Sequence, residues 1–157
     1  MDGWVVAERT LVIGVGNLLL RDEGVGIHVI RELQKRPLPP GVEVIDGGLA
    51  GVRLLDFFSG ARKVVLIDAA QMDLEPGQVV RFTPEDVRFQ SGAVKLSTHD
   101  LALPEVLAIA RALKETPPEV LLLGIQPKEI SWGTELTPEV RAAVPRVVEL
   151  VLKEINE

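Results

Sequence analysis

Two hydrophobic patterns alternate along this chain. Continuous apolar runs, which are typical of strands buried on both faces, occupy residues 10–16, 63–68 and 120–125, and residues 42–45 predict a further strand. Apolar residues at helical spacing occur at 23–35, 49–58, 101–113 and from Thr137 to near the C-terminus. Residues 78–82 follow a Pro-Gly turn and predict a shorter edge strand, whereas 84–97 show no period and predict a long loop.

Two of the helical segments carry further signals. In 23–35, the apolar stripe formed by Val25, Val29, Ile30 and Leu33 predicts the buried face. His28 lies among charged residues outside that stripe, so we expect it to be exposed to solvent. In the last segment, Thr137 is the expected N-cap and Pro138 the first helical residue, with a kink expected at Pro145.

The alternation of strands and helices predicts the fold class. Strands that are apolar on both faces belong in a mostly parallel sheet covered by helices on both sides. We therefore expect an α/β protein, a three-layer α/β/α arrangement around a twisted sheet of about five strands. With 157 residues, the chain is expected to form a single domain over 1–157, in which 1–9 are an extra N-terminal stub.

Composition and charge exclude several classes of function. With 17 basic and 23 acidic residues, the net charge of −6 argues against a nucleic-acid partner. The absence of cysteine excludes disulfides and thiol nucleophiles. The apolar runs are far shorter than the roughly 18 residues of a membrane helix, and the N-terminus does not resemble a signal peptide. We therefore expect no membrane association and a cytoplasmic location.

Three residues could act together on a metal ion. Glu23 opens a helix after the first strand, Asp68 ends the third strand, and His99 stands at a loop-to-helix junction. Taken singly, each has an ordinary structural explanation: Glu23, like Asp22, as a helix-dipole complement, Asp68 as a hydrogen-bonded buried acid, His99 as a cap. A parallel sheet directs all three to the edge where its strands end, where ligands bind. Two carboxylates and an imidazole suit a divalent transition metal and leave coordination positions open.

A dinucleotide site is the main alternative for the first loop. Gly14 and Gly16 begin a GxGxxG-like pattern, and Asp46 occupies the usual ribose-binding place at the end of the second strand. However, Leu19 stands where the third glycine is needed, and the acids of the loop would repel a pyrophosphate. Nucleotide binding is therefore disfavoured.

A set of motifs in register resembles the hydrogenase maturation proteases. The motifs are Gly14-x-Gly16-Asn17-x-Leu19-x-x-Asp22-Glu23-Gly24-x-Gly26, Asp46-Gly47-Gly48, Ile67-Asp68-Ala69, Ser97-Thr98-His99-Asp100-Leu101, Gly124-Ile125-x-Pro127 and Leu136-Thr137-Pro138. They extend from Leu11 nearly to the C-terminus. One departure is Thr98, where many relatives have proline.

The resemblance implies an endopeptidase that removes the C-terminal extension of a [NiFe]-hydrogenase large-subunit precursor after nickel insertion. It implies that Glu23, Asp68 and His99 are the metal-binding and catalytic positions, with nickel supplied by the substrate. Another divalent transition metal could occupy the site of the isolated protein. Asn17 and the Asp46-Gly47-Gly48 loop would bind the substrate peptide.

Two questions stay open at the level of sequence. Nickel could activate the attacking water by lowering its pKa, or it could serve recognition only while a carboxylate activates the water. The chain could also be a non-catalytic nickel-dependent checkpoint or chaperone that binds the precursor, although it lacks the His- or Cys-rich tracts of a nickel chaperone.

Overall fold

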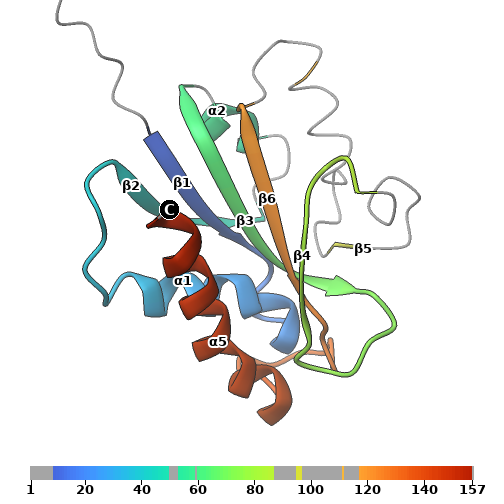
Figure 1. Ribbon diagram of the computed structural model, residues 1–157. Coiled ribbons are helices and arrows are strands. Elements are labelled where there is room, and N and C mark those ends of the chain that lie inside the picture. Colours follow the sequence, from blue (N-terminus) through green and yellow to red (C-terminus); the bar gives the residue numbers. More distant parts are fainter. Residues whose placement is uncertain are drawn as a thin grey trace, which may run out of the picture.

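A six-stranded, mostly parallel sheet forms the centre of the molecule (Figure 1). The computed structural model describes residues 9–49, 53–58, 60–86, 95–96, 111 and 117–156. The strands are β1 (Arg9–Val15), β2 (Val42–Gly48), β3 (Ala61–Gln71), β4 (Val79–Phe82), β5 (Lys95–Leu96) and β6 (Glu119–Ile125). Their order is β2-β1-β3-β6-β4, and β5 pairs with β3 off this path. The predicted α/β class is thereby confirmed.

The pairing directions agree with the expected arrangement. β2, β1, β3 and β6 are mutually parallel. β4 lies at the edge, as predicted, and it pairs antiparallel with β6. The sixth strand, β5, lies inside the segment expected to be a loop. It was not predicted because two residues are too few to show a period. It pairs with the last two residues of β3, beyond the parallel part of the sheet.

The described helices begin and end close to the predicted positions. They are η1 (Arg21–Gly24), a 3₁₀ turn, followed by α1 (Val25–Leu33), α2 (Leu54–Phe58) and α5 (Pro138–Ile155). α2 is shorter than the predicted 49–58, since Leu49 still lies in the turn after β2. The predicted helix 101–113 lies outside the described residues apart from Arg111, and the predicted stub does too apart from Arg9, which belongs to β1. None of the described helices has the length and apolar character of a membrane span.

The core has two halves, one on each face of the sheet. On one face, Leu11 and Leu66 pack with Phe58 of α2. On the other, Val12 and Val65 pack with α1 and α5, which lie side by side in Figure 1. Alternate strand residues thus serve opposite faces, as expected for a sheet between two helical layers.

Two glycines allow α1 to lie directly against the sheet. A Cβ on Gly14 would lie 2.3 Å from the carbonyl oxygen of Gly26, and a Cβ on Gly26 would lie 2.3 Å from that of Ile67. No other residue type fits at such distances. The contact brings the start of α1 onto the end of β1 and onto β3 at Ile67, next to Asp68.

Candidate functional site

Glu23 lies in η1, the turn that follows β1. Asp68 lies in β3, which pairs parallel with β1. Gly14 of β1 is in register with Ile67 of β3, so Asp68 lies immediately beyond the part of β3 that pairs with β1. The prediction that Asp68 ends the third strand is wrong, because β3 continues to Gln71 and Asp68 pairs with Gly124 of β6. After β1 the chain folds back, and Gly16 approaches the backbone of Glu23 so closely that a Cβ would lie 2.1 Å from the Glu23 carbonyl oxygen. η1 is therefore held against the turn that follows β1 and against β3.

Both carboxylates are buried at this edge. Glu23 is 1% exposed and Asp68 is 2% exposed. Burying a carboxylate costs free energy unless it is hydrogen-bonded, paired or bound to a cation. His99, the third predicted ligand, lies outside the described residues, and no group of three candidate ligands occurs within the described ranges. The three-residue set therefore stays a prediction.

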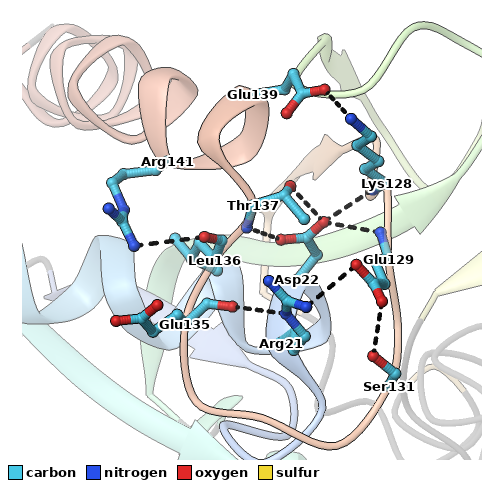
Figure 2. Close-up of polar contacts among 10 residues, drawn as sticks. All are labelled: Arg21, Asp22, Lys128, Glu129, Ser131, Glu135, Leu136, Thr137, Glu139 and Arg141. Carbon is cyan, nitrogen blue, oxygen red and sulfur yellow. Dashed lines mark hydrogen bonds and ion pairs between the residues drawn. The ribbon is translucent and has the colours of Figure 1, made fainter.

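Asp22, next to Glu23, connects η1 to the loop between β6 and α5 (Figure 2). Its carboxylate is fully buried. Oδ2 accepts hydrogen bonds from the backbone N–H groups of Lys128 (2.9 Å) and Glu129 (3.0 Å) and from the Thr137 hydroxyl (2.8 Å), and Oδ1 accepts from the Thr137 backbone N–H (2.8 Å). Burial raises the pKa of Asp22, but these donors outweigh it and hold the pKa below its ordinary value.

This cluster changes the role that the sequence assigned to Thr137. Thr137 is the N-cap residue of α5 and Pro138 stands in the first turn, as predicted. However, the Thr137 hydroxyl accepts no capping hydrogen bond from the helix, and it donates to Asp22. The start of α5 is thus fixed by an acid from the other end of the chain.

Arg21 reinforces the same connection. Its backbone N–H donates to the carbonyl of Gly133 (3.0 Å), while its guanidinium donates to Glu129 Oε2 (3.2 Å) and to the carbonyl of Glu135 (3.3 Å), as Figure 2 shows for the two side-chain contacts. Arg21 has a φ of 53°, in the left-handed region that non-glycine residues rarely adopt. Neither Arg21 nor residues 128–135 carry a periodic or motif signal in the sequence, so their role could not be predicted.

The residues predicted to bind the peptide lie along the same edge of the sheet. Gly48 ends β2 and accepts a hydrogen bond from the Gly16 N–H (2.9 Å), which joins the two loops. Asn17 Oδ1 accepts from the Leu19 N–H, and exposed Asp46 accepts from the Gly48 N–H, each at 2.9 Å. Both side chains thus stabilise local turns. A role of Asn17, Asp46, Gly47 and Gly48 in substrate binding stays a prediction.

The prediction that His28 is exposed to solvent is wrong. His28 is half-buried in a pocket of about 740 Å³ between α1 and α5, which Arg31 and Arg141 also line. Its Nε2 atom is buried and has no hydrogen-bond partner in the structure described. Burial, followed by the charges of Arg31 and Arg141, lowers the pKa of His28. The prediction failed because it considered α1 alone, whereas in the folded protein α5 partly covers the polar face of α1 that carries His28.

Comparisons with known proteins agree on one family. A family model described as "Hydrogenase maturation protease" matches residues 27–154. The hydrogenase expression/formation protein HupD of Bradyrhizobium diazoefficiens is 34% identical over 151 residues, which are 95% of this chain and 79% of HupD. The hydrogenase 2 maturation protease of Escherichia coli is 35% identical over 153 residues, covering 95% of this chain and 92% of that protein. The solved structure of the hydrogenase maturating endopeptidase HybD from E. coli superposes with a TM-score of 0.79 at 30% identity, covering 94% of this chain and 92% of HybD.

Proposed function

Because the chain belongs to the hydrogenase maturation protease family, a family of endopeptidases, we propose that it cuts the C-terminal extension from a [NiFe]-hydrogenase large-subunit precursor after nickel insertion. In this proposal the nickel belongs to the substrate, and Glu23, Asp68 and His99 recognise it. In the same proposal, cleavage takes place in the cytoplasm.

The burial of Glu23, in η1 after β1, and of Asp68, just beyond the part of β3 that pairs with β1, supports the proposal. Two acidic side chains at the edge where parallel sheets bind ligands, combined with an imidazole, form a donor set that suits a divalent transition metal. With His99 as a third ligand, the set keeps positions open for the precursor's own ligands or for water. Asn17 and the Asp46–Gly48 loop then border the peptide.

The alternative of a non-catalytic checkpoint is less well supported. The E. coli relative and the E. coli solved structure are named a maturation protease and a maturating endopeptidase, whereas HupD is named an expression/formation protein. Cleavage itself distinguishes the two functions.

The decisive experiment compares nickel-loaded with nickel-free precursor. Each form is incubated with the protein, and mass spectrometry of the large subunit follows the loss of its C-terminus. We expect trimming of the loaded form only. Equal trimming of both forms would overturn nickel recognition but leave the protease, whereas binding of the loaded form without cleavage would establish the checkpoint.

Substitution of the three proposed ligands gives the first prediction. Asp68→Asn, Glu23→Gln and His99→Ala are each expected to slow processing by about a hundredfold or more, because a lost ligand removes several kcal/mol and each 1.4 kcal/mol is about tenfold. Glu32→Gln, an exposed acid on α1, is the matched control and should process at the wild-type rate. Circular dichroism of every variant checks that it folds. Wild-type rates in Asp68→Asn would remove the central residue of the proposal.

The two chemical routes differ in their dependence on the metal ion. If the ion activates the attacking water, replacing nickel in the precursor by zinc changes the maximal rate, because the pKa of the bound water depends on the ion. If a carboxylate activates the water and nickel is only recognised, the exchange changes binding while the rate at saturation stays the same. Steady-state kinetics on the two loaded precursors separates these outcomes.

A further inference from the structure

Three large apolar side chains are exposed next to the candidate site. Trp132 is 80% exposed, Leu19 is 54% exposed and Ile130 is 50% exposed. Single exposed apolar residues are common on protein surfaces, but gathered ones mark interaction sites. We refer to these three residues as the Trp132 surface.

Backbone pairing brings Leu19 and Trp132 together although they are far apart in sequence. Leu20 and Gly133 form a parallel bridge, in which the Gly133 N–H donates to the Leu19 carbonyl (2.9 Å) and the Arg21 N–H donates to the Gly133 carbonyl (3.0 Å). Leu19 and Trp132 each precede their bridged residue by one position, so this register sets them beside one another. Ile130 lies two residues before Trp132.

The loop that carries Trp132 is firmly anchored. Asp22 binds it at Lys128, Glu129 and Thr137, while Glu129 also accepts from Arg21 and from the Ser131 hydroxyl at 3.1 Å (Figure 2). An apolar side chain presented by an ordered loop needs little further ordering on binding, which favours affinity. Trp132 is therefore exposed on a loop that these hydrogen bonds hold in place.

The Trp132 surface adjoins the two buried carboxylates. Leu19 precedes η1, which carries Glu23, and the Trp132 loop leaves the end of β6, where Gly124 is in register with Asp68 of β3. A polypeptide whose metal lies against Glu23 and Asp68 therefore passes close to this surface.

We propose that the Trp132 surface docks an apolar segment of the hydrogenase precursor that lies beside the metal, an inference that rests on the proposed function. The substrate in the proposed function is a protein, which can contact the enzyme well beyond the scissile bond. Tryptophan is the residue type most enriched among energetically dominant interface contacts. In this arrangement Trp132 and Leu19 contribute binding energy and position the precursor, while the carboxylates meet the metal.

Kinetics on the nickel-loaded precursor tests the proposal. Trp132→Ala and Leu19→Ala are expected to raise KM by about tenfold and to leave kcat within about twofold, since they remove contacts that do not change during the reaction. Leu74→Ala, an exposed leucine (40% exposed) in the loop after β3, is the matched control and should keep the wild-type KM. Unchanged KM in both variants would overturn the docking role.

A binding readout separates this proposal from the proposed function. The chain has two tryptophans, so Trp4→Phe leaves Trp132 alone, and fluorotryptophan then gives one fluorine resonance. Adding nickel-loaded precursor should shift or broaden it, and this needs no turnover. If wild type does not cut the precursor, the proposed function fails, whereas cutting with an unmoved resonance overturns the docking role. A dimer in sedimentation that Trp132→Ala dissociates would instead make this surface a contact between two copies.

Discussion

Asp22 holds two distant loops together through one buried carboxylate that accepts four hydrogen bonds. Asp22→Asn keeps the size of the side chain but exchanges an acceptor oxygen for an N–H₂ group that faces donors. We expect the free energy of unfolding to fall by about 2–4 kcal/mol, measured by urea denaturation at neutral pH. Asp46→Asn, which alters an exposed acid with one local hydrogen bond, is the control and should cost less than about 1 kcal/mol. Equal stability of both variants would contradict the role of Asp22.

His28 gives the protein a pH-dependent stability of known sign. Burial and the charges of Arg31 and Arg141 lower its pKa in the folded state, against a weaker opposing effect of Glu32. As the pH falls, the unfolded chain binds this proton first, so the stabilisation is complete above about pH 6.5 and is lost as pH falls through the folded-state pKa.

We therefore expect wild type to lose more stability than His28→Gln between about pH 7.5 and about pH 5.5, because glutamine does not titrate in that range. Urea denaturation of both proteins at the two pH values measures the difference. Processing of the precursor should be nearly unaffected by His28→Ala, since His28 lies in the pocket between α1 and α5, which neither Glu23 nor Asp68 lines. Parallel pH profiles of wild type and His28→Gln would refute the pKa argument.

At the scale of elements, the position of α1 depends on the contact of Gly26 with β3. Helix propensity alone predicts that Gly26→Ala stabilises a helix by about 1 kcal/mol. The structure predicts the opposite sign, because the new Cβ would lie 2.3 Å from the Ile67 carbonyl oxygen and would push α1 away from the strand that carries Asp68. We expect a net loss of about 3 kcal/mol and slower processing, measured by thermal denaturation and by the cleavage assay.

Gly60→Ala provides the control for that substitution. Gly60 has a φ of 77° and no atom within 4 Å of an added Cβ, so alanine there meets backbone strain without a clash. Its cost should stay near 1–2 kcal/mol, about the cost of a left-handed non-glycine residue. A Gly26→Ala variant as stable as wild type would mean that α1 moves without penalty.

At the scale of the whole molecule, a metal ion that binds only the folded protein should raise its melting temperature. At a hundredfold excess over Kd the gain is about 2.7 kcal/mol, which for a domain of this size corresponds to roughly 5–10 °C. We expect nickel, zinc or cadmium to stabilise wild type and magnesium to do so much less, because an imidazole ligand such as His99 suits transition metals. Calorimetry with metal up to millimolar concentration measures the shift.

The ligand variants supply the comparison for the metal experiment. The shift should vanish in Asp68→Asn and diminish in His99→Ala, whereas the exposed-acid variant Glu32→Gln should keep it in full. If saturating nickel leaves the melting temperature of wild type unchanged, the shared site of Glu23, Asp68 and His99 is wrong.

Much of the fold could be predicted from the chain because its strands are buried on both faces. Continuous apolar runs then stand out, and helices between them require parallel pairing. β5 could not be predicted, since a two-residue strand has no period. The true length of α2 could not be predicted either, because no capping signal in the sequence after β2 fixes where the helix begins. The burial of Glu23 and Asp68 at one edge followed from the strand order, because the ends of parallel strands meet there.

By itself, then, the sequence determined the alternation of elements, the edge of the sheet on which Glu23 and Asp68 lie, and the family resemblance. Only the tertiary structure decided that Asp22 would bind Thr137, 115 residues later, that α5 would bury His28, and that Trp132 would stand beside Leu19. The physical reason is that a local pattern records the period of one element and the face that it buries. The partners of a polar side chain, its pKa and the grouping of exposed residues depend on segments that only folding brings together.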